Sequence, residues 1–467
     1  MKILYLKIQL LNSQKLLQFK GFLYFILTFS IFSGYTAKAG NLQTNTNNLI
    51  EINPKTVNAL WFSFGTSEKT AQGKLISSPI AFDSETGFGF DFNTVSNVKI
   101  NSKTFTSQKP VYFSAVVPEG NYQVEITMGS LEKKSNITLK TESRRLLLDQ
   151  FSIKKGKLIT RTFNVNVRNI KIDDSTSISL KDREKETLDW DTKLTLEFLG
   201  DVSVQNIKII PETNLTVLYL AGDSTVTDQD VEPWASWGQF ITNYFDTSIV
   251  VANYAYSGAS LSSFKNSNRL KKILSLIKKG DYLFVEFGHN DEKIKGAGNG
   301  PWESYSNLLK EFINAAKDKG AIPVLVTPTQ RRFFNENGTL KETHGDFPAA
   351  MRTVAQKNDT ALIDLTKTTK TLYESWGDSV SRNAFVQYPA HTFPGQEKAL
   401  DDNTHFNSFG ANEIALCILQ GIRELNLPLK KQILKETPAY NPKKPNSITA
   451  WKLPMSERFE IAKPEGN

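Results

Sequence analysis

The stretch Val217-Leu218-Tyr219-Leu220-Ala221-Gly222-Asp223-Ser224-Thr225 decides the fold of the second half of this chain. An apolar run meets a small, polar turn at once, as happens where a buried strand ends at a loop. The same texture recurs further along, where apolar runs alternate with amphipathic helical windows. This alternation predicts an α/β region with a parallel sheet covered by helices on both faces.

The elements expected in this α/β region follow from the apolar periodicity. The predicted strands are 216–221, 248–253, 281–287, 321–327 and 360–364. The predicted helices are 268–278, 302–319, 346–357 and 408–425.

The part of the chain before residue 212 has a different texture. Short alternating segments occur at 60–64, 87–92, 122–128 and 162–167, separated by turn residues. We find no convincing helical window among them. Evenly spaced short strands without helices predict an antiparallel β-sandwich.

The length of 467 residues exceeds what one hydrophobic core normally serves, so we expect more than one domain. The predicted organisation is a signal peptide at 1–39, a β-sandwich domain at 40–212, a catalytic α/β domain at 213–427 and a C-terminal extension at 428–467. A hydrophobic content of 39% and a charged content of 22% fit a folded globular protein.

The N-terminus has the pattern of an export signal. Four lysines and no acid occupy residues 1–20, an apolar stretch follows at 22–32, and Ala37-Lys38-Ala39 forms a small-x-small cleavage site. The apolar stretch is too short for a stable membrane anchor, so we expect a periplasmic or extracellular protein. Losing the five lysines of residues 1–39 lowers the net charge from +8 to +3, which gives no indication of a nucleic-acid partner.

The single cysteine, Cys417, excludes a disulfide framework. It lies in the apolar helical stretch 414–419, so we interpret it as a core residue and not as a nucleophile.

Three residues with useful chemistry follow the predicted strands. Ser224 follows the first strand, Gly258 the second and Asn290 the third. Ligands of open parallel sheets gather outside the carboxyl ends of the strands, so this shared placement favours a functional site. Ser224 is the candidate nucleophile, although Asp-Ser-Thr is also a common helix N-cap.

His405 is the candidate base for Ser224, and Asp402 its orienter. The sequence has four histidines, and His405 is the one with a carboxylate three residues earlier and a predicted helix after it. That spacing places both side chains on one side of a helical turn, where the carboxylate can hold the imidazole. The alternative is a surface loop with an incidental histidine.

Gly258 and Asn290 are candidate donors to the oxyanion that forms when an ester is attacked, together with the Ser224 N–H. The alternatives are a tight turn at Gly258 and a strand-end cap at Asn290. We interpret the neighbouring His289 as structural. The chain carries no metal-binding motif, so no metal is expected.

These blocks resemble the SGNH (GDSL-type) hydrolases. The resemblance falls on Gly222-Asp223-Ser224-Thr225, on 253–258, on Gly288-His289-Asn290-Asp291 and on Asp402-x-x-His405, and it covers residues from about 215 to 427. It implies a flavodoxin-like α/β sandwich without a cofactor, with Ser224, His405 and Asp402 as the triad and Gly258 and Asn290 as oxyanion donors.

The longer context is similar to that of the rhamnogalacturonan acetylesterases, through Asp228-Gln229, Ser236-Trp237-Gly238-Gln239, Thr327-Pro328 and Thr404-His405-Phe406. Such a resemblance implies acetyl esters of pectin as substrates. Arg331, Arg332 and His344 are then either contacts to an acidic sugar or parts of a solvated loop. The front region resembles a galactose-binding-like sandwich, whose alternating aromatic residues favour a structural role.

The sequence therefore predicts a serine esterase that removes acetyl groups from plant cell-wall polysaccharide, most of all pectic rhamnogalacturonan, through an acyl-enzyme on Ser224. The expected partner is an acetylated polysaccharide or oligosaccharide; the oligomeric state stays open. The alternatives are a lipase or esterase of the same superfamily that acts on other acyl esters, and a catalytically dead carbohydrate-binding protein.

Overall fold

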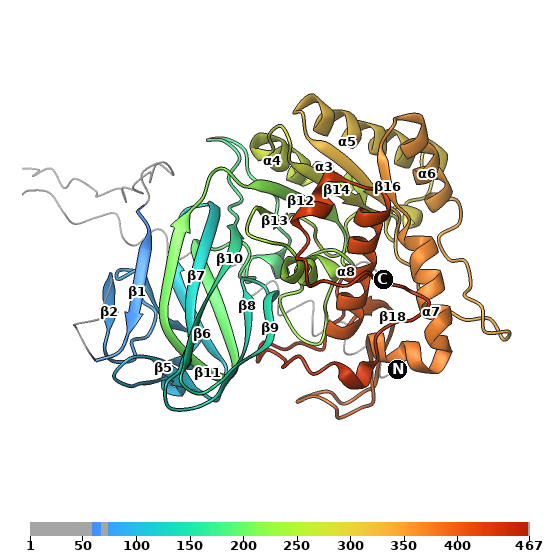
Figure 1. Cartoon of the computed structure of the whole chain (residues 1–467). Coiled ribbons are helices and arrows are strands. Elements are labelled where there is room, and N and C mark those ends of the chain that lie inside the picture. The colour runs from blue at the N-terminus through green and yellow to red at the C-terminus, as the bar shows by residue number, and fades with distance from the viewer. Residues whose placement is uncertain (1–57, 67–72, 466–467) are drawn as a thin grey trace, which may run out of the picture. The chain divides into compact units, whose positions relative to one another are not determined.

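The computed structural model describes residues 58–66 and 73–465 (Figure 1). The predicted signal peptide at 1–39 lies outside these residues. The described residues fall within one compact unit, in which a β-rich region precedes an α/β region. The β-rich region ends at Pro211 and the α/β region begins at Thr216; the predicted domain boundaries stay predictions.

The α/β region is built on a five-stranded parallel sheet with the strand order β13-β12-β14-β15-β16. The strands are β12 (Thr216–Gly222), β13 (Ile249–Asn253), β14 (Tyr282–Glu286), β15 (Ile322–Val326) and β16 (Ala361–Ile363). All five predicted strands occur, with ends that differ by one residue from most of the predicted windows.

Helices cover both faces of this sheet (Figure 1). They are α2 (Trp237–Phe240), α3 (Leu261–Asn266), α4 (Arg269–Leu276), α5 (Ser306–Asp318), α6 (Phe347–Lys357), α7 (Leu365–Ser381) and α8 (Ser408–Glu424). Leu218 and Leu220 of β12 pack with α2, α7 and α8, whereas Val217 and Tyr219 pack with the residues of α3 to α6. This alternation along one strand produces the three layers.

The sequence analysis did not identify α7. Its sequence is rich in threonine, which has a low helix propensity, and its dihedral angles break at Gly377, where φ is 74°. The helix begins with an N-cap, because the Asp364 side chain accepts a hydrogen bond from the Lys367 N–H. Packing of Leu372 and Tyr373 against α8 and the sheet then overrides the weak propensity.

The β-rich region contains two sheets that share one long strand. The strands are β1 (Leu60–Phe64), β2 (Lys74–Ile76), β3 (Phe88–Asp91), β4 (Lys99–Ile100), β5 (Phe105–Ser107), β6 (Val111–Val116), β7 (Gly120–Ser130), β8 (Ser135–Thr141), β9 (Arg145–Ile153), β10 (Lys157–Val167) and β11 (Lys193–Pro211). The first half of β11 pairs with β6 and β8, and its second half with β5, β7 and β1.

Between these sheets lies an aromatic core. Phe64 packs edge to face against Phe105 and Phe113, with ring centroids 4.7 and 5.5 Å apart, and Phe90 packs against the same two rings. All four side chains are buried. The alternating aromatic residues of this region therefore form core, as the sequence pattern indicated.

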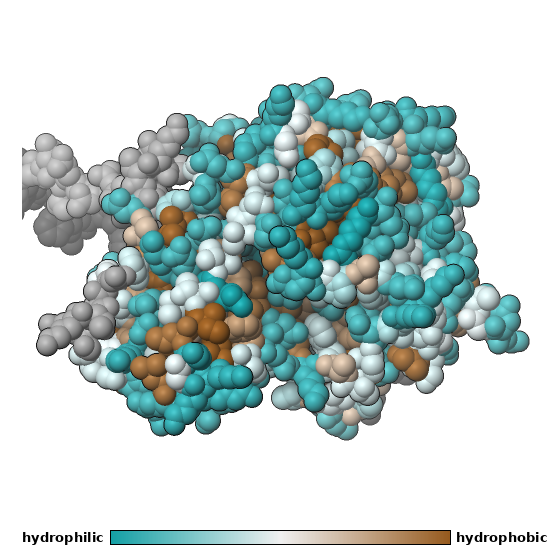
Figure 2. All heavy atoms as spheres, in the orientation of Figure 1, coloured by the Kyte–Doolittle hydropathy of each residue, from teal (hydrophilic) through white to brown (hydrophobic). Residues whose placement is uncertain are grey.

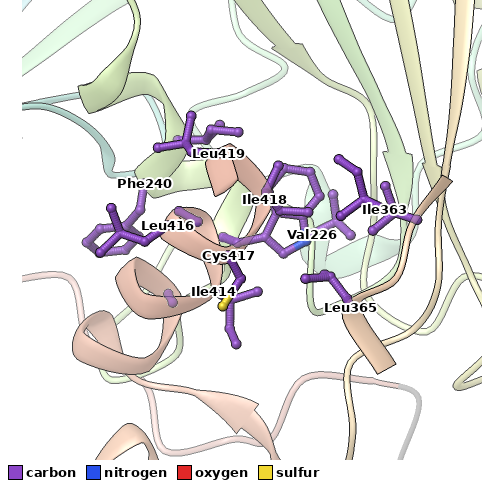
Figure 3. Close-up of a cluster of buried hydrophobic side chains, with 14 of the residues drawn as sticks. Val226, Phe240, Ile363, Leu365, Ile414, Leu416, Cys417, Ile418 and Leu419 are labelled. Carbon is purple, nitrogen blue, oxygen red and sulfur yellow. The ribbon is translucent and has the colours of Figure 1, made fainter. Parts of the chain in front are cut away.

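A second apolar cluster surrounds α8. Figure 3 shows Cys417, Ile414 and Ile418 of this helix among Val226, Ile363 and neighbouring apolar side chains. Cys417 is buried, and burial raises the pKa of its thiol well above the ordinary value. The thiol is therefore a packing group, as expected.

The remaining elements are short. A two-stranded antiparallel sheet joins β17 (Phe385–Tyr388) to β18 (Leu400–Phe406). The short helices are η3 (Thr94–Asn97), η4 (Asp182–Glu184), η5 (Ile241–Tyr244), η6 (Asp291–Lys293), η7 (Pro301–Tyr305), η8 (Arg382–Ala384), η9 (Pro428–Gln432) and η10 (Ile448–Ala450).

The outer surface over α5, α6 and α7 is largely hydrophilic (Figure 2). Within residues 58–66 and 73–465, none of the helices has the length and apolar character needed to cross a bilayer.

Candidate active site

Ser224 lies in a tightly held turn directly after β12. The Asp223 carbonyl accepts hydrogen bonds from the N–H groups of Val226 (3.1 Å) and Thr227 (3.0 Å). Gln229 Nε2 donates to the Ser224 carbonyl at 2.8 Å. The turn therefore holds Ser224 at the carboxyl end of the sheet, between β13 and β14, where the strand order reverses.

The structure brings Ser224, His405 and Asp402 together. Ser224 Oγ lies 2.8 Å from His405 Nε2, and His405 Nδ1 lies 2.9 Å from Asp402 Oδ2. These contacts give the imidazole one neighbour for each nitrogen, which is the geometry required for a serine activated by a base.

The expected helical turn at these residues is wrong, because Asp402 and His405 lie in strand β18. Asp402 Oδ1 accepts hydrogen bonds from the backbone N–H groups of Thr404 (2.7 Å) and His405 (2.8 Å). This local turn of the side chain onto its own backbone brings the carboxylate to the imidazole without a helix.

The environment of Asp402 favours its charged form. Burial opposes ionisation, but the hydrogen bond to His405, the charge of that ring and the two backbone N–H donors outweigh it. The pKa of Asp402 therefore lies below its ordinary value. Trp234 packs edge to face against His405, with ring centroids 5.7 Å apart. The Asp402 carboxylate and the Trp234 ring thus hold the imidazole in position.

Gly258 and Asn290 lie in the loops after β13 and β14. The Tyr256 N–H donates to the Gly222 carbonyl at 3.2 Å, which joins the loop of Gly258 to the end of β12. Gly258 has φ +80°, which L side chains rarely adopt. Asn290 Nδ2 donates one hydrogen bond to the Ala259 carbonyl at 3.0 Å, so the two predicted donor positions are connected. An amide carries two hydrogens, and the second can serve a ligand.

The buried carboxyl group of Glu286 is hydrogen-bonded to the turn that carries Ser224. The Thr225 hydroxyl lies 2.9 Å from Asp223 Oδ1 and 3.1 Å from Glu286 Oε1, while Trp237 Nε1 donates to Glu286 Oε2 at 2.7 Å. Burial and the charge of Asp223 raise the pKa of Glu286 to about 8. A hydroxyl has one hydrogen, so both Thr225 contacts are hydrogen bonds when Glu286 is protonated and donates.

His289, interpreted as structural, is buried beside the same turn. Its Nδ1 lies 3.5 Å from Asp223 Oδ2. Burial lowers the pKa of His289 to about 4, so the ring is neutral at pH 7.

Arg331, Arg332 and His344 do not form a solvated loop, so that alternative is wrong. Arg331 pairs with Glu292 at 2.5 Å, and His344 Nδ1 lies 2.8 Å from the same carboxylate. Arg332 pairs with Asp378. All three side chains are buried and already bound to acids or carbonyls of the chain. They therefore stabilise the loops at the strand ends.

The geometry agrees with comparisons with known proteins. Residues 220–412 match the GDSL-like Lipase/Acylhydrolase family. Over 219 residues the chain is 42% identical to the rhamnogalacturonan acetylesterase RhgT of Bacillus subtilis (strain 168), covering 46% of this chain and 94% of that enzyme. The chain belongs to the GDSL-like lipase/acylhydrolase family. The predicted resemblance and the SGNH hydrolase fold are thereby confirmed, and the chain is a carboxylic ester hydrolase.

Two further relatives come from the same organism. The probable rhamnogalacturonan acetylesterase YesY is 36% identical over 222 residues, covering 47% of this chain and 98% of that protein. The X-ray crystal structure of the protein YxiM has a TM-score of 0.42 at 22% identity, covering 79% of this chain and 99% of that one.

Two residues at the site escaped the sequence analysis. Glu286 is the single acid in the apolar strand β14, and an acid in a strand buried on both faces is a signal that could have identified it. Lys463 Nζ lies 3.2 Å from Asp402 Oδ2. Nothing in the sequence around Lys463 indicates this contact, because it joins the C-terminal segment to a strand far away in the chain.

Proposed function

We propose that this family member is a serine esterase that removes acetyl groups from pectic polysaccharide, with rhamnogalacturonan as the main substrate. The observation that carries the proposal is the line of contacts from Ser224 through His405 to Asp402. The substrate class is supported by RhgT and YesY, which match this chain over nearly their whole length.

In the proposed reaction, Ser224 Oγ attacks the acetyl carbonyl carbon while His405 Nε2 takes the hydroxyl proton. Asp402 stabilises the imidazolium that forms. The tetrahedral intermediate then collapses, the bond to the sugar oxygen breaks, and His405 returns the proton to that oxygen. Water attacks the acetyl-serine by the same route, so acetate leaves and Ser224 is restored.

The oxyanion of each tetrahedral intermediate needs donors that are in place before the reaction. We assign this role to the backbone N–H groups of Ser224 and Gly258 and to Asn290 Nδ2. Removing one such donor typically costs about 10²–10³-fold in kcat. The hydrogen bond from Asn290 to Ala259 keeps this amide in position.

The polymer substrate agrees with export of the protein, which we propose from the signal predicted at 1–39. Plant cell-wall polysaccharides are too large to enter a cell intact, so the enzyme must meet them or their fragments outside the cytoplasm.

Acetate release from matched substrates tests the proposal. Acetylated rhamnogalacturonan should give a higher kcat/KM than acetylated xylan or acetylated mannan, and p-nitrophenyl acetate a higher value than p-nitrophenyl octanoate. Preference for the octanoyl ester would favour the lipase alternative. Absence of turnover, with no labelling of Ser224 by a fluorophosphonate probe, would favour a dead carbohydrate-binding protein.

A further inference from the structure

The C-terminal segment 458–465 lies across the catalytic residues. Its backbone pairs with Glu232, which donates to the Arg458 carbonyl at 2.8 Å and accepts from the Glu460 N–H at 3.0 Å. Trp234 Nε1 donates to the Glu460 carbonyl at 3.0 Å. These bonds lead the segment past the ring that packs on His405.

Beyond residue 460 the segment spans the site from one side to the other. Lys463 Nζ contacts Asp402 Oδ2 at 3.2 Å, Pro464 is buried, and the Glu465 backbone carbon lies 3.3 Å from where a Cβ on Gly258 would stand. Asp402 orients the proposed base His405, and Gly258 is a proposed oxyanion donor. Ser224 itself is 2% exposed.

Glu465 of this segment is held by a lysine from the β-rich region. Lys181 Nζ pairs with the Glu465 carboxylate and donates to the Ser257 carbonyl at 3.0 Å. Nζ also lies 5.1 Å from the ring centroid of Tyr256, and a Cβ on Gly258 would meet it at 3.1 Å. The ammonium group is therefore fixed next to the loop that carries the proposed oxyanion donor.

A cavity of about 210 Å³ opens beside this lysine. Trp190 and Arg183 of the β-rich region line it, together with Gln229 and Ser257 of the loops around Ser224. Arg183 donates to the Lys463 carbonyl at 3.4 Å, and Arg458 and Glu460 of the segment also line this space. A sugar bound next to the reacting ester would lie between the two regions.

We propose that Lys181 forms a subsite for the carboxylate of a uronate sugar, and that Glu465 occupies it until the substrate displaces it. This inference rests on the proposed function for the identity of the acid. A glutamate side chain and a uronate present the same carboxylate, and a lysine binds either as a point charge.

The ion pair that must be broken is suited to exchange. The side chains of Lys181 and Glu465 are 34% and 49% exposed, and pairs with this much solvent contact contribute little to stability. Substrate binding can therefore replace the internal acid at small cost, whereas a buried pair would resist.

The test compares Lys181→Gln and Glu465→Gln in the full chain with the matched control Lys185→Gln, whose lysine is exposed and pairs with the exposed Asp182. The probe is non-acetylated digalacturonate, used as a competitive inhibitor of p-nitrophenyl acetate hydrolysis. We expect Lys181→Gln to raise its inhibition constant about tenfold and Glu465→Gln to lower it about threefold. Lys185→Gln should change nothing, and Lys181→Arg should restore most of the binding.

Acetylated rhamnogalacturonan and acetylated mannan complete the experiment. Lys181→Gln should raise KM for the acidic polymer more than for the neutral one, with melting temperatures equal to wild type. An unchanged inhibition constant, or an equal KM change on both polymers, overturns the subsite. Digalacturonate tests binding even if the acidic polymer releases no acetate, so failure of the proposed function would be seen separately.

Discussion

The two regions of this protein place their buried charged groups differently. In the α/β region, polar residues gather at the strand ends, where Ser224, His405 and Asp402 are aligned for chemistry. In the β-rich region the core between the sheets is apolar, and the buried cations point outward to the α/β region. The buried cations of the β-rich region thus pair with acids of the α/β region.

The attachment is concentrated on the loop that follows Ser224. Arg145 pairs with Asp228 at 2.8 Å and with Asp189 at 2.9 Å, and Arg168 contacts the same two acids. Asp228 lies four residues after the nucleophile. The β-rich region therefore acts as a brace for the nucleophile loop.

The largest effect should come from the reacting group itself. Ser224→Ala should lower kcat on p-nitrophenyl acetate by at least about 10³-fold, because no other group can form the acyl-enzyme. The melting temperature should stay within a few degrees, since a small side chain replaces another. A variant that keeps wild-type turnover would show that the aligned charges of the α/β region serve another purpose.

The next effect tests the orienting carboxylate. Asp402→Asn should lower kcat by roughly 10²–10⁴-fold, because the amide neither fixes the imidazole tautomer nor stabilises its charge. Steady-state kinetics from pH 5 to 9 measure this loss, and Asp401→Asn, at the exposed neighbouring residue, is the control. Equal kcat values for the two variants would contradict a role for Asp402.

The third prediction concerns the brace. Arg145→Met should lower the free energy of unfolding by about 3–5 kcal/mol, because it leaves Asp228 and Asp189 buried with one cation fewer. Urea denaturation measures the change. Lys208→Gln, which removes a half-exposed partner of Glu125, should cost less than about 0.5 kcal/mol. Equal losses of unfolding free energy in both variants would show that the buried Arg145 contributes no more to stability than a half-exposed lysine.

The last prediction concerns the pH dependence of stability. Glu286 has a pKa of about 8 in the folded protein, against 4.5 for an ordinary glutamate. Between pH 4.5 and 8, Glu286 keeps its proton in the folded protein and loses it in the unfolded chain. The free energy of unfolding should therefore fall as pH rises, by up to about 1.4 kcal/mol per pH unit.

Glu286→Gln removes the titratable carboxyl group and should flatten the fall of stability between pH 5 and 8. Melting curves at several pH values check this, with the exposed Glu85→Gln as the control. Parallel pH profiles for wild type and Glu286→Gln would show that Glu286 titrates normally.

The local part of the site was predictable from the sequence, and the remote part was not. Ser224, Gly258 and Asn290 follow apolar strands, and a parallel sheet gathers strand ends at one edge. The helical turn expected at Asp402 and His405 was wrong, because residue spacing alone does not distinguish a turn from a strand whose side chain folds back.

The contacts of Lys181 with Glu465 and of Lys463 with Asp402 join residues that are far apart in the sequence. No periodicity or motif encodes such pairs, since they depend on how the C-terminal segment and the β-rich region meet the strand ends. The same holds for Arg145, because the sequence does not indicate that its partners are Asp189 and Asp228.

Cys417 is the sole cysteine of the sequence and is 2% exposed. Thiol reagents will therefore leave the native protein unlabelled. A cysteine introduced at the exposed Ala462 would offer one reachable attachment point for a spin label or a fluorophore. Its signal would follow residues 458–465 in real time as acidic oligosaccharide is added.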